Sequence, residues 1–320
     1  MKKSMYLHMV LACTLSLGWA ATASAQFNGV RTQFLMTSLL DNPAAAGNSA
    51  CLDLRMGGRN QWAGFEGAPR SSFASLSGRL GGGVTFAHGM GGFVVTDQVG
   101  PWSNTRLSLA YSTKVRLTNG ARLSAGLAAG MTQYRLDIGS LVFPEFSATE
   151  DPALFGASTS QTVFPTLDFG LWYENSQTFV SLSMLNAVPT TLNEMTMTTN
   201  TGTTFVLMGG QYIKLDRRFG FRPAAQMRLN RGLPPSVDLQ GAFSVDELVS
   251  VGLGYRTGSA LVGVLSLKLF ESMTVGYSYD FGVNDLSVGG RSAHELVISL
   301  TACDKHDPYV GPDGRCPAYD

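Results

Sequence analysis

The sequence predicts an all-β protein, a transmembrane antiparallel β-barrel of about 14 strands and of the outer-membrane type. Four observations predict it. Segments that alternate between apolar and polar residues recur along the chain, and glycine is abundant at 37 of 320 residues. Charged residues make up 14% of the chain, against roughly 25% in soluble domains. After the first 25 residues, no apolar run approaches the roughly 18 residues that a membrane helix requires.

Residues 272–282 show the pattern most clearly. The odd positions are apolar or aromatic, whereas the even positions are small or polar: Met273, Val275, Tyr277, Tyr279 and Phe281 against Ser272, Thr274, Gly276, Ser278 and Asp280. A tilted strand of about ten residues is long enough to cross a bilayer. A strand of a soluble β-sandwich can look the same, so the number of copies of the pattern decides between the two.

Residues 1–25 are predicted to be a cleaved secretory signal peptide. Lys2 and Lys3 form a basic start, residues 9–21 an apolar core, and residues 23–25 (Ala-Ser-Ala) a cleavage site. The alternative is a lipid anchor on Cys13, but the apolar run before Cys13 is short. The sequence therefore predicts export.

The exported chain is divided into three parts. Residues 26–50 are an N-terminal lead-in with a turn at Asp41-Asn42-Pro43, and residues 303–320 are a cysteine-containing C-terminal tail. Residues 51–302 form the transmembrane barrel. Its predicted strands are residues 51–58, 72–80, 83–97, 104–117, 121–134, 165–174, 177–186, 204–215, 219–229, 235–245, 247–256, 259–269, 272–282 and 293–301.

The connections support a barrel. Asn119-Gly120 is a strong hairpin signal. Residues 135–164 lack any period and contain Pro144 and Pro152, so they are interpreted as a long loop. Residues 187–203, rich in Thr and Asn, form a second one. Tight turns and longer loops thus alternate, although imperfectly, as in outer-membrane barrels.

Charged residues occur on the polar face of the strands. This favours a barrel over a soluble all-β protein, because a lumen accommodates charge and a second core does not. The lumen would be lined by Arg106, Lys114, Arg116, Asp168, Asp238 and Lys268. Such a lining could form an open channel or closed salt-bridge layers.

Catalytic chemistry is poorly supported, so no enzyme, cofactor or metal site is predicted. His88, His294 and His306 lack the spacing of a zinc site, and none lies near a Gly-x-Ser-x-Gly turn. A serine–histidine pair using His294 is a remote possibility. The tail aspartates at 304, 307 and 313 do not match an EF-hand. The net charge of zero and the absence of a basic block argue against nucleic acid.

Three cysteines follow the signal peptide, and export allows disulfides. Cys303–Cys316 would close a short loop in the tail and is the first choice. Barrel closure would also bring the first and last strands together, so Cys51–Cys303 is a competitor. One thiol remains in either case.

Several segments together resemble the PorP/SprF proteins of type IX secretion and gliding systems. They are residues 42–47 (NPAAAG), 59–71 (RNQWAGFEGAPRS), 92–101 (GFVVTDQVGP), 150–156 (EDPALFG), 255–263 (YRTGSALVG), 276–282 (GYSYDFG) and 293–300 (AHELVISL). The similarity covers most of residues 34–300, in order, and residues 303–320 extend beyond the usual end of the family. These motifs look structural, so no functional residue is transferred.

The resemblance implies a non-enzymatic outer-membrane barrel without a known cofactor. Its partners would be other type IX secretion components, or a cognate secreted surface protein that it helps to place at the cell surface. The alternative from another class is a porin-like solute channel, since about 14 strands enclose more space than side chains must fill. A hydrolase on the barrel wall is a distant third.

Overall fold

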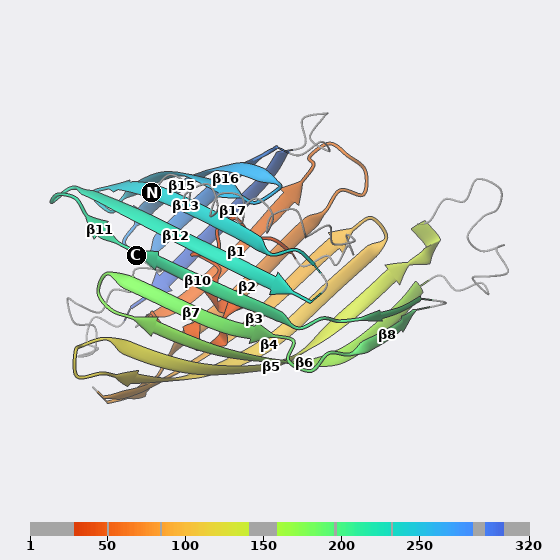
Figure 1. Ribbon diagram of the computed structural model, residues 1–320, viewed down its shortest axis with the longest axis horizontal. Helices are drawn as coiled ribbons and strands as arrows, with labels where there is room; N and C mark the ends of the chain where they lie inside the picture. Colours follow the sequence, from red (N-terminus) through yellow and green to blue (C-terminus); the bar gives the residue numbers. More distant parts are fainter. Residues whose placement is uncertain are drawn as a thin grey trace, which may run out of the picture.

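A computed structural model shows the arrangement of the chain (Figure 1). It describes residues 29–49, 51–83, 85–140, 159–194, 197–231, 233–283 and 292–303. The predicted signal peptide, Cys316, His306 and the three tail aspartates lie outside the described residues. Among those that are described, no helix is both long and apolar enough to cross a bilayer.

One antiparallel sheet contains nearly all of the strands. In chain order they are β1 (Leu52–Gln61), β2 (Arg70–Gly82), β3 (Phe86–Val99), β4 (Trp102–Arg116), β5 (Arg122–Asp137), β6 (Thr159–Glu174), β7 (Thr178–Leu185), β10 (Thr204–Gln211), β11 (Ile213–Lys214), β12 (Phe219–Asn230), β13 (Ser236–Val245), β14 (Val249–Arg256), β15 (Ala260–Phe270), β16 (Met273–Gly282) and β17 (Ser292–Ala302). A separate hairpin consists of β8 (Thr191–Glu194) and β9 (Met197–Asn200).

The sheet closes on itself. β1 pairs with β17 from Leu52↔Ala302 to Gln61↔Ala293, and β10 pairs with both β7 and β12. β10 and β11 form one strand interrupted at Tyr212, so the 15 strands of the sheet make a closed 14-stranded barrel within the described residues. The predicted fold class is confirmed.

On β4, β14 and β16, the outward apolar face and the inward polar face are as predicted. On β4 and β14, outward Leu109 and Leu253 are 69% and 76% exposed, whereas inward Ser112 is fully buried. On β16, Tyr277 and Phe281 are exposed on the outer surface and Asp280 is buried in the lumen. Lipid would cover the exposed apolar belt, because the N–H and C=O groups of paired strands bond to neighbouring strands and do not face the hydrocarbon.

The predicted lumenal charges divide into two groups. Lys114, Asp168 and Asp238 are buried inside, and Arg106 is half-buried and pairs with Asp168. Arg116 and Lys268 have the inward parity but are exposed, since Arg116 ends β4 and Lys268 lies close to the end of β15. These two residues therefore do not line the lumen.

The connections gather by length at the two ends of the barrel. One end, the short-turn end, carries residues 83–85, 117–121, 175–177, 215–218, 246–248 and 271–272. At the opposite end, the long-loop end, the chain leaves β1 at Gln61, β5 at Asp137, β7 at Leu185 and β16 at Gly282. It enters the next strand of the barrel at Arg70, Thr159, Thr204 and Ser292, respectively, and three shorter connections lie at the same end. Cys51 and Cys303 lie at the short-turn end, where β1 begins and β17 ends.

The long loop predicted for residues 135–164 was too long. β5 continues to Asp137, and β6 begins at Thr159, six residues before Pro165. The loop was predicted from the lack of a period in residues 135–164, but residues 159–164 pair with β5 all the same. Pro165 lies where β6 has no partner in β7, because β7 pairs only with residues 169–174 of β6. Proline is tolerated on such an edge. The second predicted loop, residues 187–203, contains the β8–β9 hairpin.

The exposed belt gives a prediction for depth in the membrane. Leu253, in the middle of β14, and Leu248, in a turn at the short-turn end, are both exposed leucines. Leu253→Arg should reduce the free energy of unfolding in lipid vesicles by about 2–4 kcal/mol, and Leu248→Arg by about 0–1 kcal/mol. Equal effects in a denaturant titration would contradict this placement of the belt.

Candidate functional site: a plug in the barrel lumen

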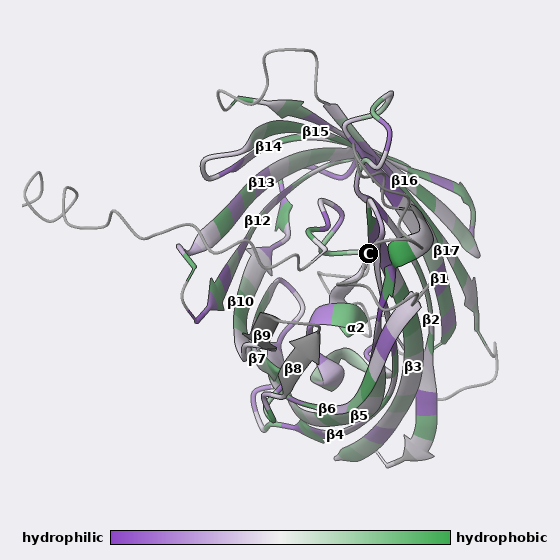
Figure 2. Cartoon of the chain, turned by 90° about the vertical axis from the view of Figure 1, so that its right-hand side faces the viewer, coloured by the Kyte–Doolittle hydropathy of each residue, from purple (hydrophilic) through white to green (hydrophobic). Residues whose placement is uncertain are grey.

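Residues 29–49, here called the plug, run through the inside of the barrel. Figure 2 shows the short helix α2 (Ser38–Asp41) within the ring of strands. The 3₁₀ turn η1 (Pro43–Ala45) follows, with Asn42 as its cap: the Asn42 side-chain oxygen accepts a hydrogen bond from the Ala44 N–H at 2.9 Å. Proline suits the first position of such a turn because its missing N–H would have no partner there.

The hydrophobic core of the molecule lies between the plug and the wall. Plug residue Phe34 packs in one cluster with Trp172, Phe179 and Met208, and the Trp172 and Phe179 rings stack at 5.1 Å. A second cluster joins the plug to several inward wall residues: Leu39, Leu40 and Ala46 with Phe73, Phe93, Val95, Ala110, Ala128 and Val297. The lumen is therefore partly apolar, which the polar-face prediction missed.

Five charged side chains from the wall form one ion cluster, here called the wall cluster: Arg59, Asp238, Arg256, Asp280 and Glu295. Arg59 pairs with Asp280 at 2.6 Å and with Glu295 at 3.2 Å. Arg256 pairs with Asp238 at 2.5 Å and with Asp280 at 2.8 Å. The cluster has one more carboxylate than guanidinium, so further hydrogen-bond donors are needed to balance it.

The plug supplies those donors at Thr32 and Gln33. The backbone N–H groups of Thr32 and Gln33 donate to the two oxygens of Glu295 at 2.7 and 3.0 Å. The Thr32 hydroxyl donates to Asp280 at 2.9 Å and accepts from both arginines of the wall cluster. Gln240 donates to the Thr32 carbonyl at 2.7 Å. Thr32 is thus the centre to which five strands of the wall attach.

Asp41 makes a second charged attachment. Its carboxylate pairs with Arg31 of the plug and with Arg228 of β12, the latter at 2.8 Å, and accepts from Gln226 at 3.2 Å. Burial alone would raise the pKa of Asp41, but the charges of Arg228 and Arg31 outweigh it. The pKa of Asp41 is consequently lowered, and the carboxylate stays ionised.

The third attachment uses the plug backbone as acceptor. Lys114, almost fully buried, donates to the Ala44 carbonyl at 3.1 Å and to the Asn48 side chain. Ser112 donates to the Ala46 carbonyl at 2.7 Å. A buried ammonium group requires such acceptors, because desolvation without them is costly.

Wall glycines make room for the plug backbone. A Cβ atom added to Gly126 would overlap the backbone of Pro43 and Ala44. At Gly170 and Gly89 it would overlap the Asn42 side chain and the Ala46 carbonyl, respectively. At Gly126 and Gly89 the backbones of the wall and the plug approach each other without a wall side chain between them, and at Gly170 the missing side chain leaves room for that of Asn42.

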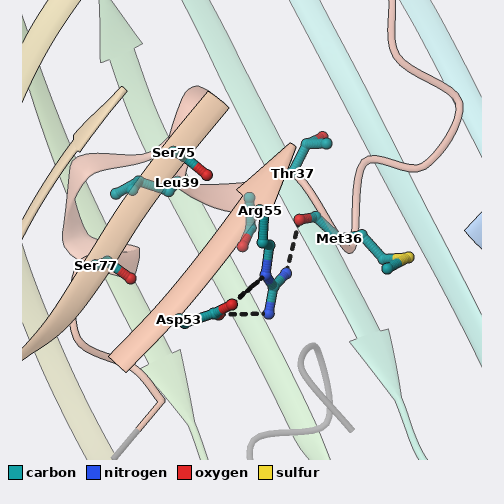
Figure 3. Close-up of a pocket in the computed structure, with 8 residues that line it drawn as sticks. Met36, Thr37, Leu39, Asp53, Arg55, Ser75 and Ser77 are labelled. Atoms are coloured by element: carbon teal, nitrogen blue, oxygen red, sulfur yellow. Dashed lines mark hydrogen bonds and ion pairs between the residues drawn. The ribbon is translucent and has the colours of Figure 1, made fainter. Parts of the chain in front are cut away.

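A small cavity remains between the plug and β1 and β2 (Figure 3). It measures about 10 Å³, roughly the space for one water molecule. Arg55 lies in its lining, pairs with Asp53 at 2.7 Å and donates to the Met36 carbonyl at 2.7 Å. The cavity is too small for a solute.

The described histidines lie on the outer surface, away from the plug. His88 shares a hydrogen bond with the Tyr111 hydroxyl, and His294 one with the Tyr277 hydroxyl, each at 2.7 Å. Tyr279 packs edge-on against His294 at 4.9 Å between ring centroids. In the part of the chain that the structure describes, no three His, Cys, Asp or Glu side chains group as metal ligands would.

In the structure, Cys51 and Cys303 form a disulfide, with Cα atoms 4.3 Å apart. This is the second of the two pairings weighed from the sequence. The first, Cys303–Cys316, cannot form together with this bond, and Cys316 itself lies outside the described residues. Antiparallel pairing of β1 and β17 places Leu52 opposite Ala302, so the adjacent cysteines meet.

The fit between Gly126 and the plug is testable. Gly126→Ala should reduce the free energy of unfolding by about 1–3 kcal/mol, as expected for overpacking, and should raise ion conductance in planar bilayers by displacing the plug. Gly263→Ala is the control, because its added methyl group would lie 4.0 Å from the nearest atom. If both variants behave like the wild type, the plug does not pack against β5.

The disulfide gives a separate prediction. A non-reducing digest of the purified protein should contain the Cys51 peptide linked to the Cys303 peptide. Cys51→Ser should abolish that link and cost about 2–4 kcal/mol of stability, whereas Cys316→Ser should leave both unchanged. A peptide linking Cys303 to Cys316 in the wild type would contradict the pairing.

Solved structures with a similar fold are outer-membrane barrels. The Pseudomonas putida toluene transporter TodX matches with 11% identity and a TM-score of 0.46, covering 88% of this chain and 95% of that one. The CymD monoaromatic hydrocarbon channel has 15% identity, a TM-score of 0.48 and coverages of 89% and 96%. Acinetobacter baumannii Omp33 has 8% identity, a TM-score of 0.43 and coverages of 79% and 99%. These likenesses indicate nothing about what this chain binds.

No curated protein matches the sequence. The family described as type IX secretion system membrane protein PorP/SprF matches residues 23–300. That range includes the plug, the wall cluster and all the strands except the last two residues of β17. The chain belongs to the PorP/SprF family of type IX secretion system membrane proteins.

Proposed function

We propose that this protein is a non-enzymatic accessory component of a type IX secretion or gliding apparatus, which docks protein partners instead of conducting solutes. The partners would be other components of the apparatus or a cognate secreted surface protein. Family membership supports a role in the type IX apparatus. The plug in the lumen supports docking of partners over conduction of solutes.

The observation that carries the proposal is the attachment of the plug on all sides. Thr32, Asp41 and the backbone of residues 44–46 contact strands on opposite walls of the barrel, through ion pairs, hydrogen bonds and close backbone packing. A porin-like channel requires a continuous aqueous path. A lumen occupied in this way favours a rigid barrel whose ends are available to partners.

The barrel fold and the family point to the outer membrane. In such barrels the short turns face the periplasm and the longer loops face the outside. The long-loop end would then meet secreted surface proteins, and the short-turn end, with Cys51 and Cys303, would meet periplasmic components. The cleaved signal peptide, residues 1–25, belongs to this proposal as the export signal.

Deletion of the gene tests the docking role. The surface and secreted proteomes of the deletion strain should lose one or more secreted proteins, and the wild-type gene should restore them. Unchanged proteomes, together with unchanged motility, would refute the role.

Conductance tests the alternative. Purified wild-type protein in planar bilayers should show no steady open channel, because the plug occupies the lumen. Steady channels in the wild type would instead favour the porin-like function.

A further inference from the structure

Among the strands that the structure describes, β6 has a paired strand on only one side along part of its length. β6 has 16 residues and pairs with β5 over all of them, from Thr159↔Asp137 to Glu174↔Arg122. β7 has 8 residues and reaches only Phe169, and one further bond joins the Ala187 N–H to the Leu167 carbonyl at 2.7 Å. Among the described residues, no strand pairs with the other side of residues 159–166 (Figure 1).

The bond to Leu167 fixes which backbone groups face the open side. In an antiparallel ladder, the N–H and C=O of one residue point to the same neighbour, and successive residues alternate. Because Leu167 faces β7, the backbone groups of Pro165, Val163 and Gln161 face the open side. We call these three residues the β6 edge. It presents three carbonyls, but only two N–H groups, since proline has none.

The β6 edge lies on the side of the apolar belt that is nearer to the long-loop end of the barrel. A strand needs about 9–11 residues to cross a bilayer. A strand of that length that starts at Glu174, at the short-turn end, reaches the other side of the bilayer near residue 165. Gln161 and Val163 therefore lie at or beyond the boundary of the membrane at the long-loop end.

Contacts with β5 also keep residues 159–164 of β6 in an extended conformation, which is the conformation that pairing with a further strand requires. Tyr134 of β5 and Phe164 of β6 stack at 5.6 Å, and the Gln133 and Gln161 side chains share a hydrogen bond of 3.1 Å. The register of β5 and β6 is continuous, without a bulge. The extended two-stranded ribbon is therefore stiff where it passes β7.

Proteins usually protect a strand edge with charges, bulges or prolines. Residues 159–164 read Thr-Ser-Gln-Thr-Val-Phe, with no charge and with three β-branched residues, and the proline comes only at 165. An uncharged, extended segment of another chain matches such an edge, since main-chain hydrogen bonds would supply affinity and side chains the specificity.

We propose that the β6 edge binds an extended, uncharged and β-prone segment of the secreted surface protein, which adds as a strand beside β6. This proposal rests on the docking role proposed above and names the surface and the chemistry through which the docking occurs. A second copy of this chain, or residues 141–158 of the same chain, are the competing occupants that the experiment must separate.

Val163→Pro tests this proposal. The substitution removes a backbone N–H group from the β6 edge and leaves the hydrogen bonds between β6 and β5 in place. Pro165, two residues further on with the same parity, shows that the barrel tolerates proline there. In cells, surface display of the secreted proteins that depend on this gene should fall about tenfold or more. Val163→Thr, which keeps the N–H, should retain display.

A photo-cross-linking residue at position 163 of the full-length protein gives an independent measurement. It should form an adduct with the same secreted protein that disappears from the surface of the deletion strain. Position 171 is the matched control: Leu171 is also exposed on β6, but it is paired with Leu182, so no adduct is expected there.

The outcomes are distinguishable. If gene deletion leaves all surface proteins in place, the docking role itself fails. If deletion removes a surface protein but Val163→Pro displays it normally, the docking role stands and the β6 edge is overturned. Adducts at position 163 only with a second copy, or only within the same chain, overturn the edge as well.

Discussion

The structure depends on one constraint: each charge that points into the barrel must find a partner away from bulk water. The wall cannot meet this demand alone. Glu295 receives the N–H groups of Thr32 and Gln33, Lys114 donates to the carbonyl of Ala44, and Arg228 pairs with Asp41. Removing one partner of a buried ion pair typically costs about 3–5 kcal/mol. The plug and the wall therefore stabilise each other, and the lumen is the core of the molecule.

The two strands that close the barrel also help to hold the plug. The plug ends at Ser49, whose hydroxyl accepts a hydrogen bond from the Cys51 N–H at 3.2 Å, and Cys51 is bonded to Cys303. β1 and β17, the two strands joined by this disulfide, are the furthest apart in the chain and also supply Arg59 and Glu295 to the wall cluster. Pairing of the chain ends thus assembles both the seam and part of the binding surface for the plug.

The alternation of apolar and polar residues in the sequence was sufficient to predict the wall of the barrel. It predicted the faces of β4 and β16 and the burial of Asp280, because these follow from the alternation along a single strand. It predicted the 14-stranded barrel from the number of such segments. It failed for Arg116 and Lys268, since parity does not indicate how near a residue lies to a strand end. It also began β6 at Pro165 instead of Thr159, because residues 135–164 show no period although residues 159–164 pair with β5. The plug was missed, because contacts such as that of Thr32 with Glu295 join residues that are distant in sequence. The small residues Ala44 and Ala46, which lie opposite inward Gly126 and Gly89, were a signal that the sequence offered.

The central claim is that residues 32–48 are a folded part of the barrel interior. Hydrogen exchange of the full-length protein in lipid, followed by mass spectrometry, tests it most directly. The N–H groups of Thr32, Gln33 and Ala44 are buried and bonded, so peptides covering the plug should exchange as slowly as those from β4 and β5. Exchange of those plug peptides within seconds, while β4 and β5 remain protected, would contradict the account.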